Sequence, residues 1–300
     1  MFSFSIIIPH YNTPDLLMRC LGSIPVRDDI QVIVIDDCSP NSDDYLERYP
    51  GLRRQNLEYY KTPQGGSAGR ARNIGLDRAK GKWVICMDAD DLFVENMEEI
   101  LEDAKDKSED VLYYNYKSVL SEDLSKEGTR TFYNNFFEDY KIRKDENIFR
   151  YSFDPMWGKI ISNKMIQSHN IRCDETPCAN DVAFSFKCGS FANTIVVIDK
   201  PFFLITQREG SLASSQFNNK KTTVIEYTTR LGVLYGLSTF VDKNNIKIKY
   251  RPYPSYAYKF LQDWPKEFWK FFFSNLLPTY TGKAMLTLAY FPYFKIFDRS

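Results

Sequence analysis

The sequence predicts an α/β fold whose mainly parallel sheet carries helices on both faces, followed by a helical C-terminal appendage. Three observations lead to this prediction. Within the first hundred residues, short apolar runs alternate with segments of helical periodicity, the pattern of a parallel sheet with crossover helices. Polar clusters follow directly after several of these runs. With 43% hydrophobic residues in 300, the chain can also bury the core of one large domain.

The predicted strands of the first half are continuous apolar runs, as expected for strands covered on both faces. They occupy residues 4–9, 30–35, 57–60 and 83–87. A helix is predicted after the first strand, because Thr13, Pro14 and Asp15 supply an N-cap, a proline at the first helical position and an acid in the first turn. Further helices are predicted over residues 42–49 and from Ser67, acting as N-cap, to Lys80.

After Glu109 the alternation of strands and helices becomes irregular. Residues 121–152 show no clear period, and from Asn218 onward the pattern is mainly helical. Strands are predicted at residues 111–119, 194–198 and 201–206, and helices near residues 163–168 and from about residue 180. The predicted domains are therefore residues 1–215 for the α/β domain and residues 216–300 for a helical, aromatic-rich C-terminal region.

Charge and cysteine usage exclude several classes of protein. The chain has 39 basic and 39 acidic residues, so its net charge of zero gives no electrostatic case for nucleic acid binding. Its six cysteines include no Cys-x-x-Cys pair, which predicts a reduced, cytoplasmic chain. The N-terminal apolar run is too short for a signal peptide. The sequence contains no stretch of about 20 apolar residues, so no membrane span is predicted.

Four polar clusters follow predicted strands. They are His10–Asn12, Asp36–Asp37, Gly65–Asn73 and Asp88–Asp91. Because ligands of open α/β sheets bind at the carboxyl ends of the strands, the clusters are expected to converge on one edge. Asp88 and Asp90 form the one Asp-x-Asp of the sequence, and carboxylates so spaced can bind a hard cation such as Mn²⁺ or Mg²⁺. The alternative is an acid-rich turn that caps the next helix.

Asp36 and the arginines after the Gly65–Ser67 turn are further candidates. A carboxylate at Asp36 can accept the N–H of a uracil, or can cap the following turn. Arg70 and Arg72 lie near a predicted helix N-terminus, where two guanidinium groups make a good diphosphate site. The alternative for these arginines is a solvated basic face.

Four segments contain the polar clusters. They are Ser-Ile-Ile-Ile-Pro-His-Tyr-Asn (5–12), Val-Ile-Val-Ile-Asp-Asp-Cys-Ser (32–39), Gly-Gly-Ser-Ala-Gly-Arg-Ala-Arg-Asn-Ile-Gly (65–75) and Met-Asp-Ala-Asp-Asp (87–91). In order and spacing they resemble the motifs of glycosyltransferase family two. A weaker likeness extends through residues 156–160, 171–175 and 180–181 to about residue 215. The resemblance implies the GT-A fold, with residues 1–110 as the nucleotide-sugar half and residues 111–215 as the acceptor half. A dehydrogenase or Walker-type site is disfavoured, because no glycine-rich loop follows the first strand.

The resemblance also implies roles for the residues at matching positions. Pro9, Tyr11 and Asp36 would line the nucleoside site, with Asp36 reading the base. Arg72, assisted by Arg70, would contact the nucleotide or its diphosphate.

The remaining donor contacts would come from three residues. Asp88 would bind ribose or metal, and Asp90 would bind the metal. Arg208 lies in a segment that resembles the family's Arg-x-x-x-Ser and would cover the donor, unless it forms a surface salt bridge. Trp157 could stack on an acceptor sugar, with a core position as the alternative.

Asp181 matches the position of the catalytic base that the resemblance implies. Family members usually have Glu-Asp there, whereas this chain has Asn180 and Asp181, so the base is retained and its neighbour differs. Inversion at the anomeric carbon needs one base for the acceptor proton and one electrophile for the leaving diphosphate. The alternative for Asp181 is a helix N-cap.

The resemblance implies an inverting glycosyltransferase that moves a sugar from a nucleoside-diphosphate sugar, with UDP as the default nucleotide. The acceptor would be a hydroxyl of a glycan or lipid-linked glycan in surface polysaccharide synthesis. Two alternatives stay open. A non-catalytic nucleotide-sugar binding or assembly protein would account for Asn180. A sugar nucleotidyltransferase would carry a glycine-rich, basic loop after its first strand, and that loop is absent.

The C-terminal region combines basic and aromatic residues. Residues 241–300 carry ten Lys and Arg against four Asp and Glu, and residues 251–300 hold 16 of the 47 aromatic side chains. Aromatic runs alternate with Lys and Arg over residues 253–297, which is typical of segments that lie on an anionic membrane surface. This predicts peripheral contact with the cytoplasmic membrane face. Packing on the domain and a homodimer contact are the alternatives.

Overall fold

The structure is a computed structural model that describes residues 2–40, 42–208, 224–248 and 266. The chain forms two compact units, residues 1–219 and 220–300. In the second unit the described helix is α10, Val224–Lys243, where the sequence pattern is helical. None of the helices in the described ranges has the length and apolar character needed to cross a bilayer. Apart from residue 266, the segment 253–297 with its predicted membrane contact lies outside the described residues.

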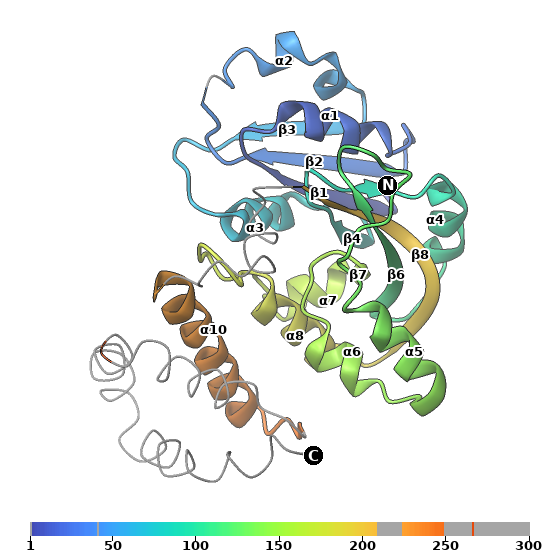
Figure 1. The fold of residues 1–300 in the computed structure, drawn as a ribbon, viewed down its shortest axis with the longest axis vertical. Helices are drawn as coiled ribbons and strands as arrows, with labels where there is room; N and C mark the ends of the chain where they lie inside the picture. The colour runs from blue at the N-terminus through green and yellow to red at the C-terminus, as the bar shows by residue number, and fades with distance from the viewer. Residues whose placement is uncertain (1, 41, 209–223, 249–265, 267–300) are drawn as a thin grey trace. The chain divides into compact units, whose positions relative to one another are not determined.

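The described part of the first unit is built on one eight-stranded sheet in the order β3-β2-β1-β4-β7-β6-β8-β5 (Figure 1). Its strands are β1 (Phe4–His10), β2 (Ile30–Asp36), β3 (Leu57–Lys61), β4 (Trp83–Cys86), β5 (Leu92–Phe93), β6 (Val111–Leu120), β7 (Lys159–Ser162) and β8 (Ile195–Gln207).

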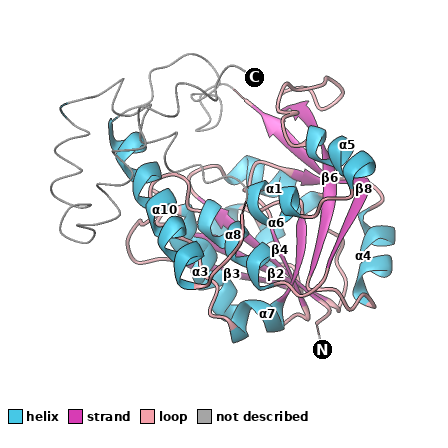
Figure 2. Ribbon diagram, turned by 90° about the horizontal axis from the view of Figure 1, so that it is seen from below, coloured by secondary structure: helices cyan, strands magenta, loops and turns pink. Residues whose placement is uncertain are grey.

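Helices surround this sheet, as Figure 2 shows with α4 on one side of the strands and α3 and α7 on the other. They are α1 (Pro14–Gly22), α2 (Tyr45–Arg48), α3 (Ala68–Arg78), α4 (Met97–Lys105), α5 (Asn134–Arg143), α6 (Asn147–Ser152), α7 (Asn163–Ser168) and α8 (Val182–Phe191). A 3-10 turn, Pro50–Arg53, follows α2. The helix predicted over residues 42–49 is therefore shorter than expected.

The predicted α/β class is confirmed, and the sheet combines parallel and antiparallel strands. Strands β3, β2, β1 and β4 pair in parallel, and β6 pairs in parallel with β8. Strand β7 lies between β4 and β6 and is antiparallel to both, and β5 is antiparallel to β8. The parallel set brings the carboxyl ends of β1, β2 and β4 to one edge, as the polar clusters predicted.

The two strands predicted at residues 194–198 and 201–206 form a single long strand, β8, which curves beside β6 in Figure 1. Proline lacks the N–H that a strand interior uses, so a proline within a strand needs an irregularity in the pairing. In the structure Pro201 pairs with Asn115 where the register between β6 and β8 shifts. The irregularity accommodates the proline, and the strand continues past it.

Helix α3 packs closely on the sheet and thereby fixes the residues at its start. A Cβ atom at Gly75 would lie 2.4 Å from Ile7 Cγ2 of β1, so glycine is required for this approach. The predicted N-cap is confirmed, since Ser67 Oγ accepts from the backbone N of Arg70 at 3.2 Å. Thr13 differs from the prediction, because its side chain makes no capping hydrogen bond at α1.

Candidate active site

The ends of β1 and β2 expose one predicted nucleoside residue and enclose another. Tyr11 is 58% exposed and Pro9 is partly exposed. Asp36 has no exposed surface, and its carboxylate accepts from His10 Nδ1 at 2.8 Å and from Ser39 N at 2.7 Å. Burial opposes the charge of Asp36, but the bonds from His10 and Ser39 hold its pKa below the ordinary value. Tyr11 is therefore accessible to a ligand, whereas the side chain of Asp36 is not.

Asp37 connects the end of β2 to the glycine-rich turn before α3. Its two carboxylate oxygens lie 3.0 and 3.1 Å from the backbone N of Gly66, which donates to them. Arg70 folds back over the same turn, since a Cβ atom at Gly66 would lie 2.5 Å from Arg70 Cδ. The turn that the sequence assigned to the diphosphate is therefore held beside the strand-end clusters.

Arg72 joins the end of β4 to the start of α8. One guanidinium nitrogen donates to Asp88 Oδ1 at 2.6 Å, and the other donates to Asn180 Oδ1 at 2.6 Å. Arg72 is only 7% exposed. Burial works against its charge, yet the carboxylates of Asp88 and Asp181 keep the pKa of Arg72 above its ordinary value. Side chains more than 90 residues apart in the chain thus meet at one guanidinium.

Asp90 has a fixed backbone and a partly exposed carboxylate. Its carbonyl oxygen accepts from Arg19 at 2.8 Å and from Thr206 Oγ1 at 2.9 Å. Its carboxylate is 27% exposed and lies 3.4 Å from Arg208 Nε. Burial and the neighbouring Asp88 raise the pKa of Asp90, while Arg208 opposes the rise. The predicted donor contact Arg208 is therefore brought to the Asp-x-Asp turn.

Arg19 and Thr206 are two supports of this turn that the sequence did not reveal. Arg19 also donates to the backbone O and to the side-chain Oγ of Ser121, at 2.6 and 3.0 Å. Thr206 donates its backbone N to Asp91 Oδ1 at 2.6 Å. The sequence signal for Arg19 was an arginine between the apolar residues Met18 and Cys20 of α1, and nothing there indicates a partner 71 residues away.

The Asp-x-Asp turn supplies some of the ligands that a divalent cation site needs. Asp88 and Asp90 are 38% and 27% exposed and supply hard oxygen ligands of the kind that Mn²⁺ and Mg²⁺ prefer. Asp91 is buried, and burial together with Asp90 raises its pKa well above the ordinary value, so a cation would relieve crowded negative charge. Within the described residues no three His, Cys, Asp or Glu side chains gather around one point. Further ligands would therefore come from a bound donor or water.

Asp181 lies at the start of α8 with its carboxylate unused by the helix. It occupies the N-cap position, but its side chain makes no capping hydrogen bond. Burial raises the pKa of Asp181, Asp88 adds to the rise, and the charge of Arg72 opposes it. The capping alternative is thus not realised, and the role of this carboxyl as the base stays a prediction.

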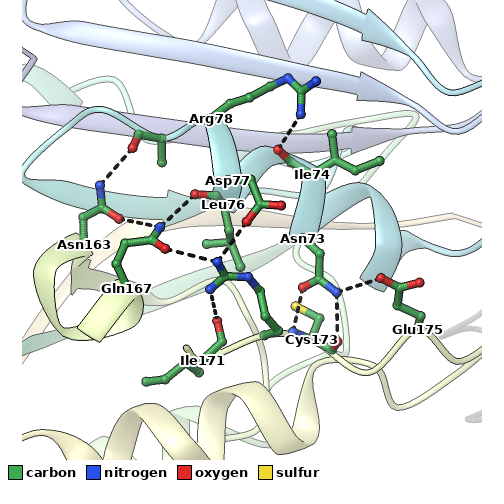
Figure 3. Close-up of polar contacts among 12 residues, drawn as sticks. Asn73, Ile74, Leu76, Asp77, Arg78, Asn163, Gln167, Ile171, Cys173 and Glu175 are labelled. Atoms are coloured by element: carbon green, nitrogen blue, oxygen red, sulfur yellow. Dashed lines mark hydrogen bonds and ion pairs between the residues drawn. The ribbon is translucent and has the colours of Figure 1, made fainter. Parts of the chain in front are cut away.

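The segment before Asp181 is fastened to α3 (Figure 3). Asn73 accepts from the backbone N of Cys173 at 2.8 Å and donates to its backbone O at 3.0 Å. Arg172 donates to Asp77 Oδ1 at 2.8 Å. A Cβ atom at Gly69 would lie 2.1 Å from the carbonyl oxygen of Asp174, so α3 meets the segment without room for a side chain.

Lys159 holds the other side of α8, although the sequence suggested no role for it. It is fully buried and donates to Phe153 O at 2.8 Å, to Pro155 O, and to Ser185 Oγ at 3.1 Å. Burial lowers the pKa of Lys159 to about 8. The hydrogen bond from Lys159 to Ser185 holds the first turn of α8. In the same turn, Ser185 donates its backbone N to the carbonyl oxygen of Asp181.

Trp157 lies within an aromatic cluster. It is 7% exposed, and its ring centroid lies 4.6 Å from that of Tyr116 and 6.0 Å from those of Tyr133 and Phe153. The structure therefore places it as the core alternative expects, and its contact with an acceptor sugar stays a prediction.

Comparison with known proteins identifies the family and the fold of the chain. Residues 5–164 match the family model described as glycosyl transferase family 2. The chain is 28% identical over 228 residues to the poly(ribitol-phosphate) beta-N-acetylglucosaminyltransferase TarS of Staphylococcus aureus, which covers 72% of this chain and 38% of that protein. The matched region is thus well under half of the relative's length.

Two solved structures share the fold. The structure of S. aureus TarS 1-349 in complex with UDP-GlcNAc matches with a TM-score of 0.58 and 22% identity, over 89% of this chain and 83% of that one. The mannosyltransferase PcManGT from Pyrobaculum calidifontis, in complex with GDP-Man and Mn²⁺, matches with a TM-score of 0.54 and 13% identity, over 99% and 88%.

Proposed function

The chain belongs to glycosyl transferase family 2, and from this membership we propose that it transfers a sugar from a nucleoside-diphosphate sugar, preferably UDP-linked, to a hydroxyl group of a glycan or lipid-linked glycan. The name of the S. aureus relative describes a β-N-acetylglucosaminyltransferase of poly(ribitol-phosphate), and a solved structure of TarS holds UDP-GlcNAc. The solved complex supports a UDP-sugar donor, and the name of the relative supports a polymer as acceptor.

The reaction that fits the site is a single displacement with inversion. The acceptor oxygen attacks the anomeric carbon, its bond to the sugar forms as the bond to the diphosphate oxygen breaks, and the hydroxyl proton passes to a base. Asp181 would be that base, because its carboxylate is not used by α8 and burial raises its pKa. The diphosphate leaves with the bonding electron pair.

Asp90, together with Asp88, would hold Mn²⁺ or Mg²⁺ beside the diphosphate. A bound cation would supply positive charge to the leaving group. The PcManGT structure in complex with GDP-Man and Mn²⁺ supports such a cation. Among the chain's own residues, Arg72 keeps a fixed positive charge against Asp88, and Arg208 lies 3.4 Å from Asp90. Both arginines would therefore face the donor phosphates.

Tyr11 and Pro9 would contact the nucleoside, as their exposure permits. Asp36 is enclosed, so we assign it the support of the strand-end turn rather than direct contact with the base. Asp37 is partly exposed, so of these two carboxylates it is the one accessible to a nucleobase. Arg70 would assist at the diphosphate from the glycine-rich turn.

One observation carries the proposal: the Arg72 guanidinium contacts both Asp88, in the Asp-x-Asp turn, and Asn180, next to Asp181. This contact supports the proposal, because it joins the Asp-x-Asp turn to the residue next to Asp181, and a displacement reaction requires donor and base to lie close together.

A panel of nucleotide-sugars tests the proposal. The chain, with and without Mn²⁺, is incubated with UDP- and GDP-sugars, and the midpoint of thermal unfolding is measured. We expect at least one UDP-sugar to raise the midpoint in the presence of the cation and to be hydrolysed slowly.

Asp90→Ala is the control, and it should abolish both the rise and the hydrolysis. Protection without hydrolysis in the parental chain would favour a non-catalytic nucleotide-sugar binder. Absence of protection by every nucleotide-sugar would contradict the proposal.

The location of the protein is a separate proposal. A lipid-linked acceptor would favour peripheral contact with the cytoplasmic membrane face through residues 253–297, whose basic and aromatic composition suits an anionic surface. A homodimer contact through the same segment is the competing proposal.

A further inference from the structure

We infer that His10 is a positioning residue for donor binding, whose neutral imidazole closes a ring of hydrogen bonds and so fixes the turn that carries Tyr11. The inference rests on the proposed binding of a nucleotide-sugar. It concerns a buried side chain that would touch neither the donor nor the acceptor.

The ring joins the turn after β1 to the turn after β2. His10 Nδ1 lies 2.8 Å from Asp36 Oδ2, and Ser39 N donates to Asp36 Oδ1 at 2.7 Å. Asn12 N donates to Ser39 Oγ at 2.7 Å, and Thr13 N donates to His10 Nε2 at 3.1 Å. Because Asn12 and Thr13 are adjacent in the chain, these four hydrogen bonds form a closed ring.

The partners of His10 determine its protonation. The backbone N–H of Thr13 can only donate, so Nε2 accepts and carries no proton. The carboxylate of Asp36 accepts, so the proton is on Nδ1. The ring therefore requires the neutral, Nδ1-protonated form of His10, which is 2% exposed.

The ring also encloses two strained backbone positions. Asn12, between His10 and Thr13, has φ of 51°, and Cys38, between Asp36 and Ser39, has φ of 62°. Both values lie in the left-handed region, which is unfavourable for Cys38 and less so for Asn12, because asparagine enters this region more readily than most residues. The hydrogen bonds on either side of each residue compensate this strain, so loss of the ring should let both turns relax.

The turns that the ring fixes carry the groups exposed to a donor. Tyr11 projects between two ring members and is 58% exposed. Asp37, between Asp36 and Ser39, accepts from Gly66 of the glycine-rich turn. Within the described part of the chain, His10 contacts Asp36, Thr13 and Tyr45 and makes no contact with Asp181. Its loss should therefore weaken donor binding and leave the chemical step nearly unchanged.

Two amide substitutions separate the contacts of His10, because each can replace one of the two ring nitrogens. In His10→Asn the amide nitrogen can replace Nδ1 as donor to Asp36, but the acceptor for Thr13 N is lost. In His10→Gln the amide oxygen can replace Nε2, but the donor to Asp36 is lost. His10→Phe keeps a ring against Tyr45, whose ring centroid lies 6.0 Å away, and removes both hydrogen bonds.

The measurements are the Kd of UDP and of GDP with Mn²⁺, and kcat and KM for UDP-GlcNAc hydrolysis. We expect Asn and Gln each to raise Kd and KM about fivefold to tenfold, the effect of one lost hydrogen bond, and Phe to raise them further. The kcat should stay within about twofold. A merely structural role would lower the active fraction, and therefore kcat, without raising KM.

The second histidine provides a matched control and a spectroscopic readout. His169 is exposed and stacks on Phe191, so His169→Asn should change neither Kd nor kcat. The chain has two histidines, so this variant leaves one imidazole to observe. Its ¹⁵N chemical shifts at neutral pH should report a proton on Nδ1; a proton on Nε2 would overturn the ring.

The outcomes distinguish the two proposals. If the parental chain binds neither UDP nor GDP, the donor site is wrong and the role of His10 in it is wrong as well. If the parental chain binds a nucleotide and the folded Asn and Gln variants bind it equally well, only the inference on His10 is overturned.

Discussion

Arg72 keeps its charge in the interior because two acceptors meet its guanidinium there. Asp88 and Asn180 accept on different nitrogens, each at 2.6 Å, while Nε is buried without a partner in the described residues. A buried charge with one acceptor missing costs several kcal/mol, so both contacts matter. The planar fork reaches both acceptors at once, which a lysine ammonium on a flexible stem does not do equally well.

Asp181→Asn is expected to leave donor binding nearly intact and to lower transfer at least 100-fold, because the amide cannot take the acceptor proton. Steady-state kinetics with the identified donor and acceptor, together with calorimetric donor binding, measure the two effects. Transfer at the parental rate would show that another group is the base.

The same substitution predicts a pH-dependent change in stability. Burial raises the pKa of Asp181 above its ordinary value of 3.8, so the folded state disfavours the charged form. The stability that this carboxyl contributes is present below the unfolded pKa and is lost as pH rises through the folded pKa.

Asp181→Asn removes that loss. The variant should therefore unfold at a higher temperature than the parental chain at about pH 7, and the difference should shrink as pH falls towards about 4. Thermal unfolding at a series of pH values measures it. A variant less stable than the parental chain at about pH 7, but equally stable near pH 4, would mean that Arg72 depends on the charge of Asp181.

At the scale of elements, the strand-end clusters could be predicted because one topological rule governs them. Parallel strands end at the same edge, so polar residues after β1, β2 and β4 had to lie near one another. The contact of Arg19 with Asp90 could not be predicted, since it depends on how α1 packs. Likewise α5 and α6 lack a clear period, and aromatic packing of Phe149 and Phe153 stabilises that region.

Gly69→Ala tests the junction of α3 with the segment before α8. Its Cβ would lie 2.1 Å from Asp174 O and 3.0 Å from Asn180 Cβ, so the segment must move. We expect a loss of about 1–3 kcal/mol in the free energy of unfolding and a lower kcat. Denaturant unfolding and transfer kinetics measure both.

Gly22→Ala is the matched control, because nothing lies within 4 Å of the added Cβ in α1. It should be neutral or stabilise by up to about 1 kcal/mol through helix propensity. Equal stability of the two alanine variants would mean that the segment before α8 yields easily.

At the scale of the whole molecule, the residues assigned to the donor all lie in the unit of residues 1–219. The predicted boundary at residues 215–216 is close to the division between the two units, and the role of the second unit stays a prediction. The basic and aromatic composition of residues 253–297 predicts membrane contact, but residues 249–265 and 267–300 are outside the described part.

A chain ending at residue 219 should keep its Kd for UDP with Mn²⁺ within about twofold, because it retains the donor residues. It should lose co-sedimentation with anionic phosphatidylglycerol vesicles, which the parental chain should show at low salt. Equal vesicle binding by the short chain would contradict a membrane role for residues 253–297.

The position of β7 between β4 and β6 has a consequence for synthesis of the chain. Strand β4 ends at residue 86, whereas its partner β7 is complete only at residue 162, 76 residues later. At roughly 5–20 residues per second on the ribosome, the edge of β4 stays uncovered for several seconds. An uncovered edge invites pairing with another nascent chain, so chains halted between residues 87 and 158 should aggregate or recruit chaperones, whereas chains released beyond residue 207 should not.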